Sequence, residues 1–174
     1  GGIRSIADIR RALRSGADKI AINTHATKHP EFVTEAAHAF GSQCIVGSVE
    51  AKRTGKGWEA FIDNGRVVTG LDAVEWAKRL VALGAGELLI TSVDQEGTAK
   101  GYDVELIKAI APHVNVPVIA CGGAGNPQDI ISVIQEGRAD AVSVARIFHY
   151  NKYSILDIKK ALKQEGLTVR IPRR

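Results

Sequence analysis

Short apolar runs alternate with amphipathic stretches along most of this 174-residue chain. The apolar runs are rich in Val, Ile and Ala, and they predict buried strands at 19–23, 43–49, 87–93, 116–122 and 140–148. The amphipathic stretches predict helices at 5–15, 29–39, 71–83, 103–112, 127–136 and 154–165. Apolar strands separated by helices indicate an α/β fold whose parallel sheet is covered by helices.

One stretch, 52–70, interrupts this alternation. Its segments "WEAFI" and "RVVT" flank the letters "DNG". Asn-Gly favours the two-residue turns that join hairpin strands, because both residues tolerate positive φ. We therefore expect a small hairpin between the second strand and the third helix.

The two ends of the chain resemble each other. Residues 1–23, "GGIRSIADIRRALRSGADKIAIN", and residues 122–145, "GGAGNPQDIISVIQEGRADAVSVA", share a glycine pair, an Asp-Ile, a glycine, an Ala-Asp and a strand, with one residue inserted. A full strand, "VPVIAC", precedes the second copy, whereas the first copy opens the chain at its glycines. On this pattern we expect the chain to start within a repeat unit and to be a fragment.

The paired glycines suggest anion sites. Glycines after a strand let the backbone approach a ligand closely, and the N–H groups that follow can hold an anion. Tight-turn geometry alone would explain a single pair. Two copies in equivalent units favour two phosphate sites, near Gly2 and Gly123.

Composition narrows the class of protein. A net charge of +4 and a balanced apolar content are ordinary for a globular domain and suit an anionic substrate. Dispersed basic residues and few aromatic ones argue against nucleic-acid binding, and no apolar run is long enough to span a bilayer. Cys44 and Cys121 lack zinc-type spacing, so we expect reduced, buried thiols, no metal and a cytoplasmic location.

Several strings are far more specific than a glycine pair. They include "GADKIAIN", "FGSQCIV", "TGLDAVEWAKRLVALGAGELLITSVDQEGT" and "PVIACGGAGN". With them, essentially the whole chain resembles the cyclase subunit of imidazole glycerol phosphate synthase, of histidine biosynthesis. The resemblance implies a (βα)8 TIM barrel of about 250 residues. Residues 1–174 would then be a single partial domain, an incomplete barrel lacking roughly its first three strands. We expect such an open sheet to be inactive alone and prone to associate.

The resemblance also implies a reaction. That family converts a bis-phosphorylated ribulosyl aminoimidazole carboxamide to imidazole glycerol phosphate and aminoimidazole carboxamide ribotide. The ammonia comes from a glutaminase subunit in a heterodimer, and no cofactor is needed. A substrate with a phosphate at each end fits the two glycine units.

By the same resemblance, Glu50 and Glu96 are the candidate catalytic residues, at positions where the family has aspartate. Glu50 ends the run "CIVGSVE", at the strand end where barrel enzymes keep their chemistry, and its carboxylate would act as general acid or base. The alternatives are a salt bridge from Glu50 to Lys52 and a solvated loop around Glu96.

The resemblance places one substrate phosphate at Gly2, Asn23 and Thr24. It places the other at Gly97, Gly123, Ala145 and Arg146. Arg146 replaces a small serine of the family, and its guanidinium could bind a phosphate directly or block the pocket.

Lys19 and Glu87 stand at the starts of two inward-facing strands, where charges would be costly unless paired. In the family these positions form a charged gate for ammonia. The alternative is a structural ion pair.

Three functions remain open at this point. The first is the cyclase. The second is its paralogue in surface-polysaccharide sugar amidation, which the departures at Glu50, Glu96 and Arg146 keep in view. The third is a non-catalytic scaffold that binds a glutaminase.

Overall fold

Five parallel strands form the core of a single sheet. The structure, a computed structural model, describes residues 2–171. The parallel order is β1-β2-β5-β6-β7. Their bounds are Ile20–Ile22 for β1, Ile45–Thr54 for β2, Glu87–Ser92 for β5, Val118–Cys121 for β6 and Ala141–Ser143 for β7. The predicted α/β fold with a parallel sheet is confirmed.

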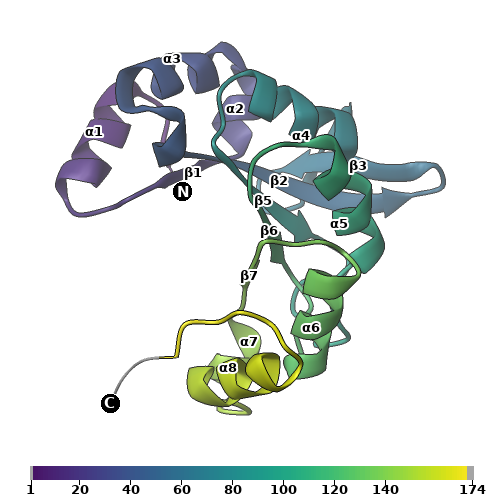
Figure 1. Cartoon of the computed structure of the whole chain (residues 1–174). Helices are drawn as coiled ribbons and strands as arrows, with labels where there is room; N and C mark the ends of the chain where they lie inside the picture. The colour runs from purple at the N-terminus through teal and green to yellow at the C-terminus, as the bar shows by residue number, and fades with distance from the viewer. Residues whose placement is uncertain (1, 172–174) are drawn as a thin grey trace.

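The helices follow one face of this sheet in an arc and leave the other face uncovered (Figure 1). All six predicted helices are present, and each end lies within two residues of its prediction. The bounds are α1 Ile6–Arg14, α3 Glu31–Phe40, α4 Ala73–Ala82, α5 Val104–Ile110, α6 Pro127–Gln135 and α8 Ile155–Gln164, with the short α2 Thr24–Lys28 and α7 Arg146–His149 added. Alternate strand residues such as Ile22, Val49 and Leu88 face the helices and are buried.

The sheet is open. In the part of the chain that the structure describes, β1 and β7 each pair with one parallel neighbour and not with each other. Ala21 in β1 and Ala141 in β7 are accordingly exposed. Unpaired strand edges of this kind leave backbone donors and acceptors to water. None of the helices within residues 2–171 is long and apolar enough to cross a membrane.

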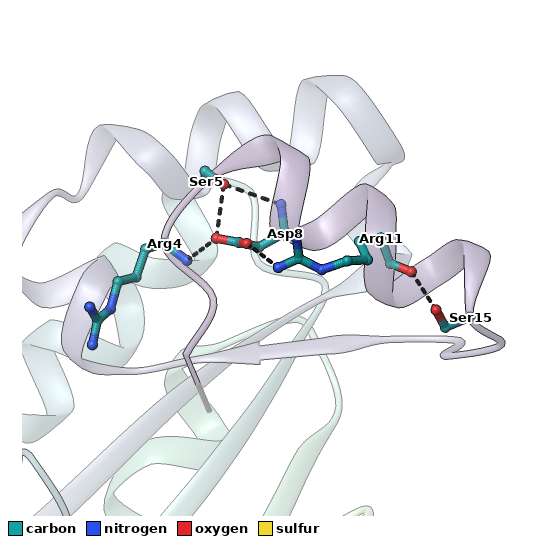
Figure 2. A network of polar contacts seen from close by, with 5 residues as sticks. All are labelled: Arg4, Ser5, Asp8, Arg11 and Ser15. Carbon is teal, nitrogen blue, oxygen red and sulfur yellow. Dashed lines mark hydrogen bonds and ion pairs between the residues drawn. The ribbon is translucent and has the colours of Figure 1, made fainter.

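A side-chain cap starts the first helix (Figure 2). The Ser5 hydroxyl oxygen accepts from the backbone N–H of Asp8, at 3.2 Å. The Asp8 carboxylate in turn accepts from the Ser5 hydroxyl at 2.8 Å and from the backbone N–H of Arg4 at 3.1 Å. These bonds, the one from Ser5 first, hold the pKa of Asp8 below its usual value. The hydrogen bonds of the cap therefore stabilise the ionised form of the Asp8 carboxylate.

The second copy of the repeat is built in the same way. The Asn126 side chain accepts from the backbone N–H of Asp129, and the Asp129 carboxylate accepts from the N–H groups of Gly125 and Asn126. Gly125 thus takes the place of Arg4 in the first cap. The repeat found in the sequence corresponds to two glycine–helix–strand units, α1–β1 and α6–β7.

The interruption at 52–70 is a hairpin of β3 (Gly57–Ile62) and β4 (Val67–Asp72), as predicted. Its turn is longer than the expected Asn-Gly pair. Three of its residues, Asp63, Asn64 and Gly65, have positive φ. Strand β2 also runs five residues beyond its predicted end, since residues 50–54 pair antiparallel with β3. β1 pairs with residues 45–47 of β2, whereas β3 pairs with residues 50–54. The hairpin therefore lies beyond the end of β1 along β2.

Two local predictions were wrong. The predicted strand 140–148 ends at Ser143, and α7 follows it, with Ile147 buried, Phe148 half-buried and Arg146 and His149 exposed. Cys44 lies in a 3-10 turn, Ser42–Cys44, and is half-buried, as is Cys121 in β6. A short apolar run fits a strand and a buried helical turn equally well, so periodicity alone did not separate them.

Candidate active site

Two pockets open where the parallel strands end, on the side from which β5, β6 and β7 lead into their loops. The first has a volume of about 690 Å³ and lies beside β1 and β2. The second, of about 50 Å³, lies beside β6 and β7. The first is lined by three predicted phosphate residues and one predicted catalytic residue: Gly2, Asn23, Thr24 and Glu50. The second is lined by the remaining predicted residues of both kinds: Glu96, Gly97, Gly123, Ala145 and Arg146.

Glu50 reaches the first pocket because of strand alternation. Val49 and Ala51 point to the helices and are fully buried, so Glu50 between them faces the uncovered side of the sheet. One oxygen of its carboxylate accepts from the backbone N–H of Gly65, at 2.7 Å. In the described residues Glu50 forms no salt bridge with Lys52, whose ammonium lies 5.8 Å from the centre of the Phe61 ring. The alternative interpretation, a salt bridge from Glu50 to Lys52, is therefore wrong.

Two hydrogen bonds also connect the end of the β3–β4 hairpin to the end of β1. The Asn23 side-chain amide donates to the carbonyl oxygen of Phe61, and the backbone N–H of Asp63 donates to the Thr24 hydroxyl oxygen, both at 3.3 Å. A hydroxyl that accepts a hydrogen bond can still donate its own proton, and within residues 2–171 the Thr24 hydroxyl has no acceptor. Asn23 and Thr24 therefore serve the hairpin as well as lining the pocket.

Sequence reasoning missed three basic residues of the first pocket, Arg4, His25 and Lys28. A signal was present, because Arg4 lies in "GGIRS" beside Gly2, and "THATK" continues directly from Asn23. Each is one or a few residues from a predicted phosphate residue.

The glycines of the two units differ in what surrounds them. Gly123 has φ +107, and a Cβ there would lie 2.0 Å from the carbonyl oxygen of Gly101. Gly101 also donates its N–H to the Gly123 carbonyl oxygen, at 2.9 Å. Gly2 has φ +85, but a Cβ there would meet nothing within 4 Å. Close packing thus explains glycine at position 123, and only the backbone conformation requires it at position 2.

Arg146 lies at the second pocket with its guanidinium held on both sides. It donates to the carbonyl oxygen of Gly97 and lies 5.2 Å from the centre of the Tyr150 ring. Glu96 lines the same pocket and is exposed. Arg146 thus bridges the end of β7 and the loop that carries Gly97, beside this small pocket.

A buried tyrosine, Tyr102, forms a hydrogen bond beside the second pocket. The Tyr102 hydroxyl donates to the backbone carbonyl of Ser143, at 3.1 Å. Burial raises the pKa of Tyr102 well above its usual value, so the hydroxyl keeps its proton. This bond ties the loop after β5 to the end of β7 across β6.

Lys19 and Glu87 form an ion pair at the opposite ends of the strands from Glu50. The Lys19 side chain is 45% exposed and the Glu87 side chain 19%. The two residues face the uncovered side of the sheet, as alternation predicted. Their role as a gate stays a prediction.

Comparison with known proteins shows the family of this chain. The family model described as "Histidine biosynthesis protein" matches residues 1–154. The chain is also 50% identical over 171 residues to "Imidazole glycerol phosphate synthase subunit HisF" from three strains of Dehalococcoides mccartyi. The match covers 98% of this chain and 68% of each relative. The chain belongs to the HisF family.

Membership in the HisF family confirms the resemblance found in the sequence. It places the chain among the proteins of histidine biosynthesis, with the cyclase subunit of imidazole glycerol phosphate synthase as its type. The parallel α/β sheet is consistent with the TIM-barrel-like fold of such proteins. In this HisF-family chain, both pockets lie at the strand ends where barrel enzymes hold their substrates.

Proposed function

We propose that the chain acts in the cyclase subunit of imidazole glycerol phosphate synthase. It would use ammonia to convert a bis-phosphorylated ribulosyl aminoimidazole carboxamide to imidazole glycerol phosphate and aminoimidazole carboxamide ribotide. The observation that carries this proposal is the position of Glu50. It lines the larger of the two pockets described above, which lie at the same end of the parallel strands.

Glu50 is suited to proton transfer. One carboxylate oxygen is engaged by the Gly65 N–H, which fixes the side chain, and the group borders a pocket that can hold a substrate. Positioned carboxylates act as general acids or bases in this way. Glu96 stands at the other pocket, where we propose that it contacts the substrate near its second phosphate.

The two pockets can receive the two ends of one molecule. Four strand-to-strand steps separate β1 from β7, roughly 19 Å along the sheet at the usual strand spacing. The first phosphate would bind at Gly2, Asn23 and Thr24, and the second at Gly97, Gly123, Ala145 and Arg146. Glycine-rich backbone and a guanidinium are both suited to phosphate.

The ammonia would come from a glutaminase subunit bound at the other end of the strands. The Lys19–Glu87 ion pair lies at that end, on the uncovered face. We propose that opening of this pair admits ammonia toward Glu50, as the resemblance implies. The printed name "subunit" of the relatives is in keeping with such an assembly.

Catalysis would require a closed barrel. Because β1 and β7 do not pair within the described residues, we propose that the 174-residue chain does not turn over by itself. The test is a chimera in which residues 1–174 replace the matched 68% of the Dehalococcoides mccartyi subunit.

We expect the purified chimera, supplied with ammonium and the bis-phosphorylated substrate, to form imidazole glycerol phosphate. The chimera carrying Glu50→Gln should lose at least about a hundredfold in kcat, in the range of general acid–base catalysis. A folded chimera without any turnover would contradict the proposed function.

One observation favours the amidation paralogue as a second candidate. The second pocket is small and Arg146 lies against it, which would hinder a second phosphate. If the chimera is inactive and Arg146→Ser restores cyclisation, the pocket was blocked. If Arg146→Ser also fails, the paralogue becomes the better proposal.

A further inference from the structure

We propose that Arg4, His25 and Lys28 form a cationic wall of the first pocket, which binds a phosphomonoester dianion and takes up a proton at His25 when it does so. This inference deepens the proposed function and rests on it only for the identity of the natural substrate. It adds three side-chain ligands to a site that was predicted from glycine, asparagine and threonine.

The three basic residues come from two segments that border the same cavity. Arg4 precedes α1, and His25 and Lys28 lie three residues apart on α2, on the same face of the helix. The Arg4 backbone N–H belongs to the Asp8 cap, but its guanidinium points away from that cap (Figure 2). Within residues 2–171, neither Arg4 nor Lys28 forms an ion pair. Their charges are therefore available to a ligand.

The same cavity also has acidic lining residues, Glu50 from β2 and Asp63 from the hairpin turn. The backbone N–H of Asp63 donates to the hydroxyl oxygen of Thr24, which precedes His25. An anionic group would be attracted to the cations and repelled by the carboxylates. A substrate would thus bind with its phosphate at the cationic wall and its uncharged reacting part toward Glu50.

The surroundings of His25 make it the responsive member of the wall. Its ring packs edge-on against Phe32, with centroids 4.7 Å apart, and lies 4.8 Å from the ring of His29. Burial, followed by the neighbouring His29 and Arg4, lowers the pKa of His25, and Glu31 opposes this weakly. Glu31 is itself 3.5 Å from His29, and Glu35 lines the adjoining surface cavity.

Burial, His29 and Arg4 thus favour the uncharged form of His25 while the pocket is empty. A dianion beside the ring reverses the balance, because it favours the imidazolium. By linkage, anion binding must then take up a proton, and affinity must fall as the pH rises above the pKa of the free protein.

The probe for this test is sulfate, because it stays a dianion across the whole pH range of the titration. The chain is labelled at its histidine Cε1 atoms, and the five histidine signals are followed by NMR at constant ionic strength. His25→Gln assigns the His25 signal. We expect sulfate to move that signal and raise its titration midpoint by at least about half a pH unit. Inorganic phosphate at pH 7 should act on the same signal.

Two matched double variants distinguish the contribution of the cationic wall to sulfate binding from that of general surface charge. Arg4→Gln/Lys28→Gln should weaken sulfate binding about tenfold, in line with the loss of two charge-assisted contacts. Arg10→Gln/Lys108→Gln removes the same charge from exposed helix positions outside the pocket and should leave binding within about twofold. His25→Gln should remove the pH dependence of binding. The proposal is overturned if both double variants weaken binding equally, or if His25 does not respond to sulfate.

Activity of the chimera keeps this inference distinct from the proposed function. If the chimera cyclises its substrate but Arg4→Gln/Lys28→Gln leaves KM unchanged, the cationic wall is wrong and the function stands. If sulfate binds at His25 and no variant of the chimera turns over, the wall stands and the function fails.

Discussion

The backbone N–H of Gly65 donates to the carboxylate of Glu50, at 2.7 Å, and so links the tip of the β3–β4 hairpin to the candidate catalytic residue. The same tip is bonded to Asn23 and Thr24 at the end of β1. The hairpin that interrupts the α/β alternation is therefore part of the site, and its turn sets the position of Glu50.

Substitution of Gly65 should disturb this position. Gly65 has φ +72, and a Cβ there would lie 2.9 Å from a methyl carbon of Val93. We expect Gly65→Ala to lower the kcat of the chimera by about tenfold or more with little change in KM, because small misplacements of reacting groups are costly. Gly55→Ala is the control, since Gly55 lies in the turn between β2 and β3 with open space around it. Equal kcat values for the two variants would sink the idea.

The Lys19–Glu87 pair should matter more for ammonia delivery than for stability. Because Lys19 is 45% exposed, Lys19→Met should cost at most about 1 kcal/mol in the free energy of unfolding. In the chimera assembled with a glutaminase subunit, we expect it to lower glutamine-driven turnover several-fold more than turnover driven by added ammonium. Equal losses with the two nitrogen sources would show a purely structural pair.

The two repeated glycines should respond unequally to alanine. Gly123→Ala brings a Cβ against the Gly101 carbonyl and should destabilise the chain by about 3 kcal/mol or more. Gly2→Ala meets no neighbour, so only its left-handed conformation opposes it, at about 1 to 2 kcal/mol. Urea-induced unfolding of the two variants measures the difference. Indistinguishable unfolding midpoints would contradict the close packing at Gly123.

The cap of α1 should make a pH-dependent contribution to stability. Ser5→Ala should cost about 1 kcal/mol at neutral pH, as is usual for an N-cap serine. Because the Ser5 hydroxyl and the Arg4 N–H lower the pKa of Asp8 in the folded chain, the stabilising effect of Asp8 is complete above its unfolded pKa of about 4. It is lost as the pH falls through the lower folded value.

Asp8→Asn should accordingly destabilise the chain at neutral pH and have no effect in strong acid. Urea unfolding at a series of pH values tests this. Since the side chains of Ser5 and Asp8 share one hydrogen bond, the cost of the double variant should be less than the sum of the single costs. Additive costs would mean that the two residues act separately.

The sequence by itself determined the helices, the parallel strands, the hairpin, the repeat and the family, because each is written in local periodicity, in turn residues or in specific strings. It also named some of the residues of each pocket, since the end of a strand and the loop after it are neighbours along the chain. The faces of Lys19 and Glu87 followed from the two-residue period of a strand.

Only the tertiary structure decided how these pieces meet. The Glu50–Gly65 bond joins residues on different strands, and its partner could not be read from spacing because the length of the turn was misjudged. The inclusion of Arg4, His25 and Lys28 in one pocket depends on how α1 and α2 pack beside β1. Such contacts arise from packing between elements, whereas local periodicity records only which face of an element is apolar.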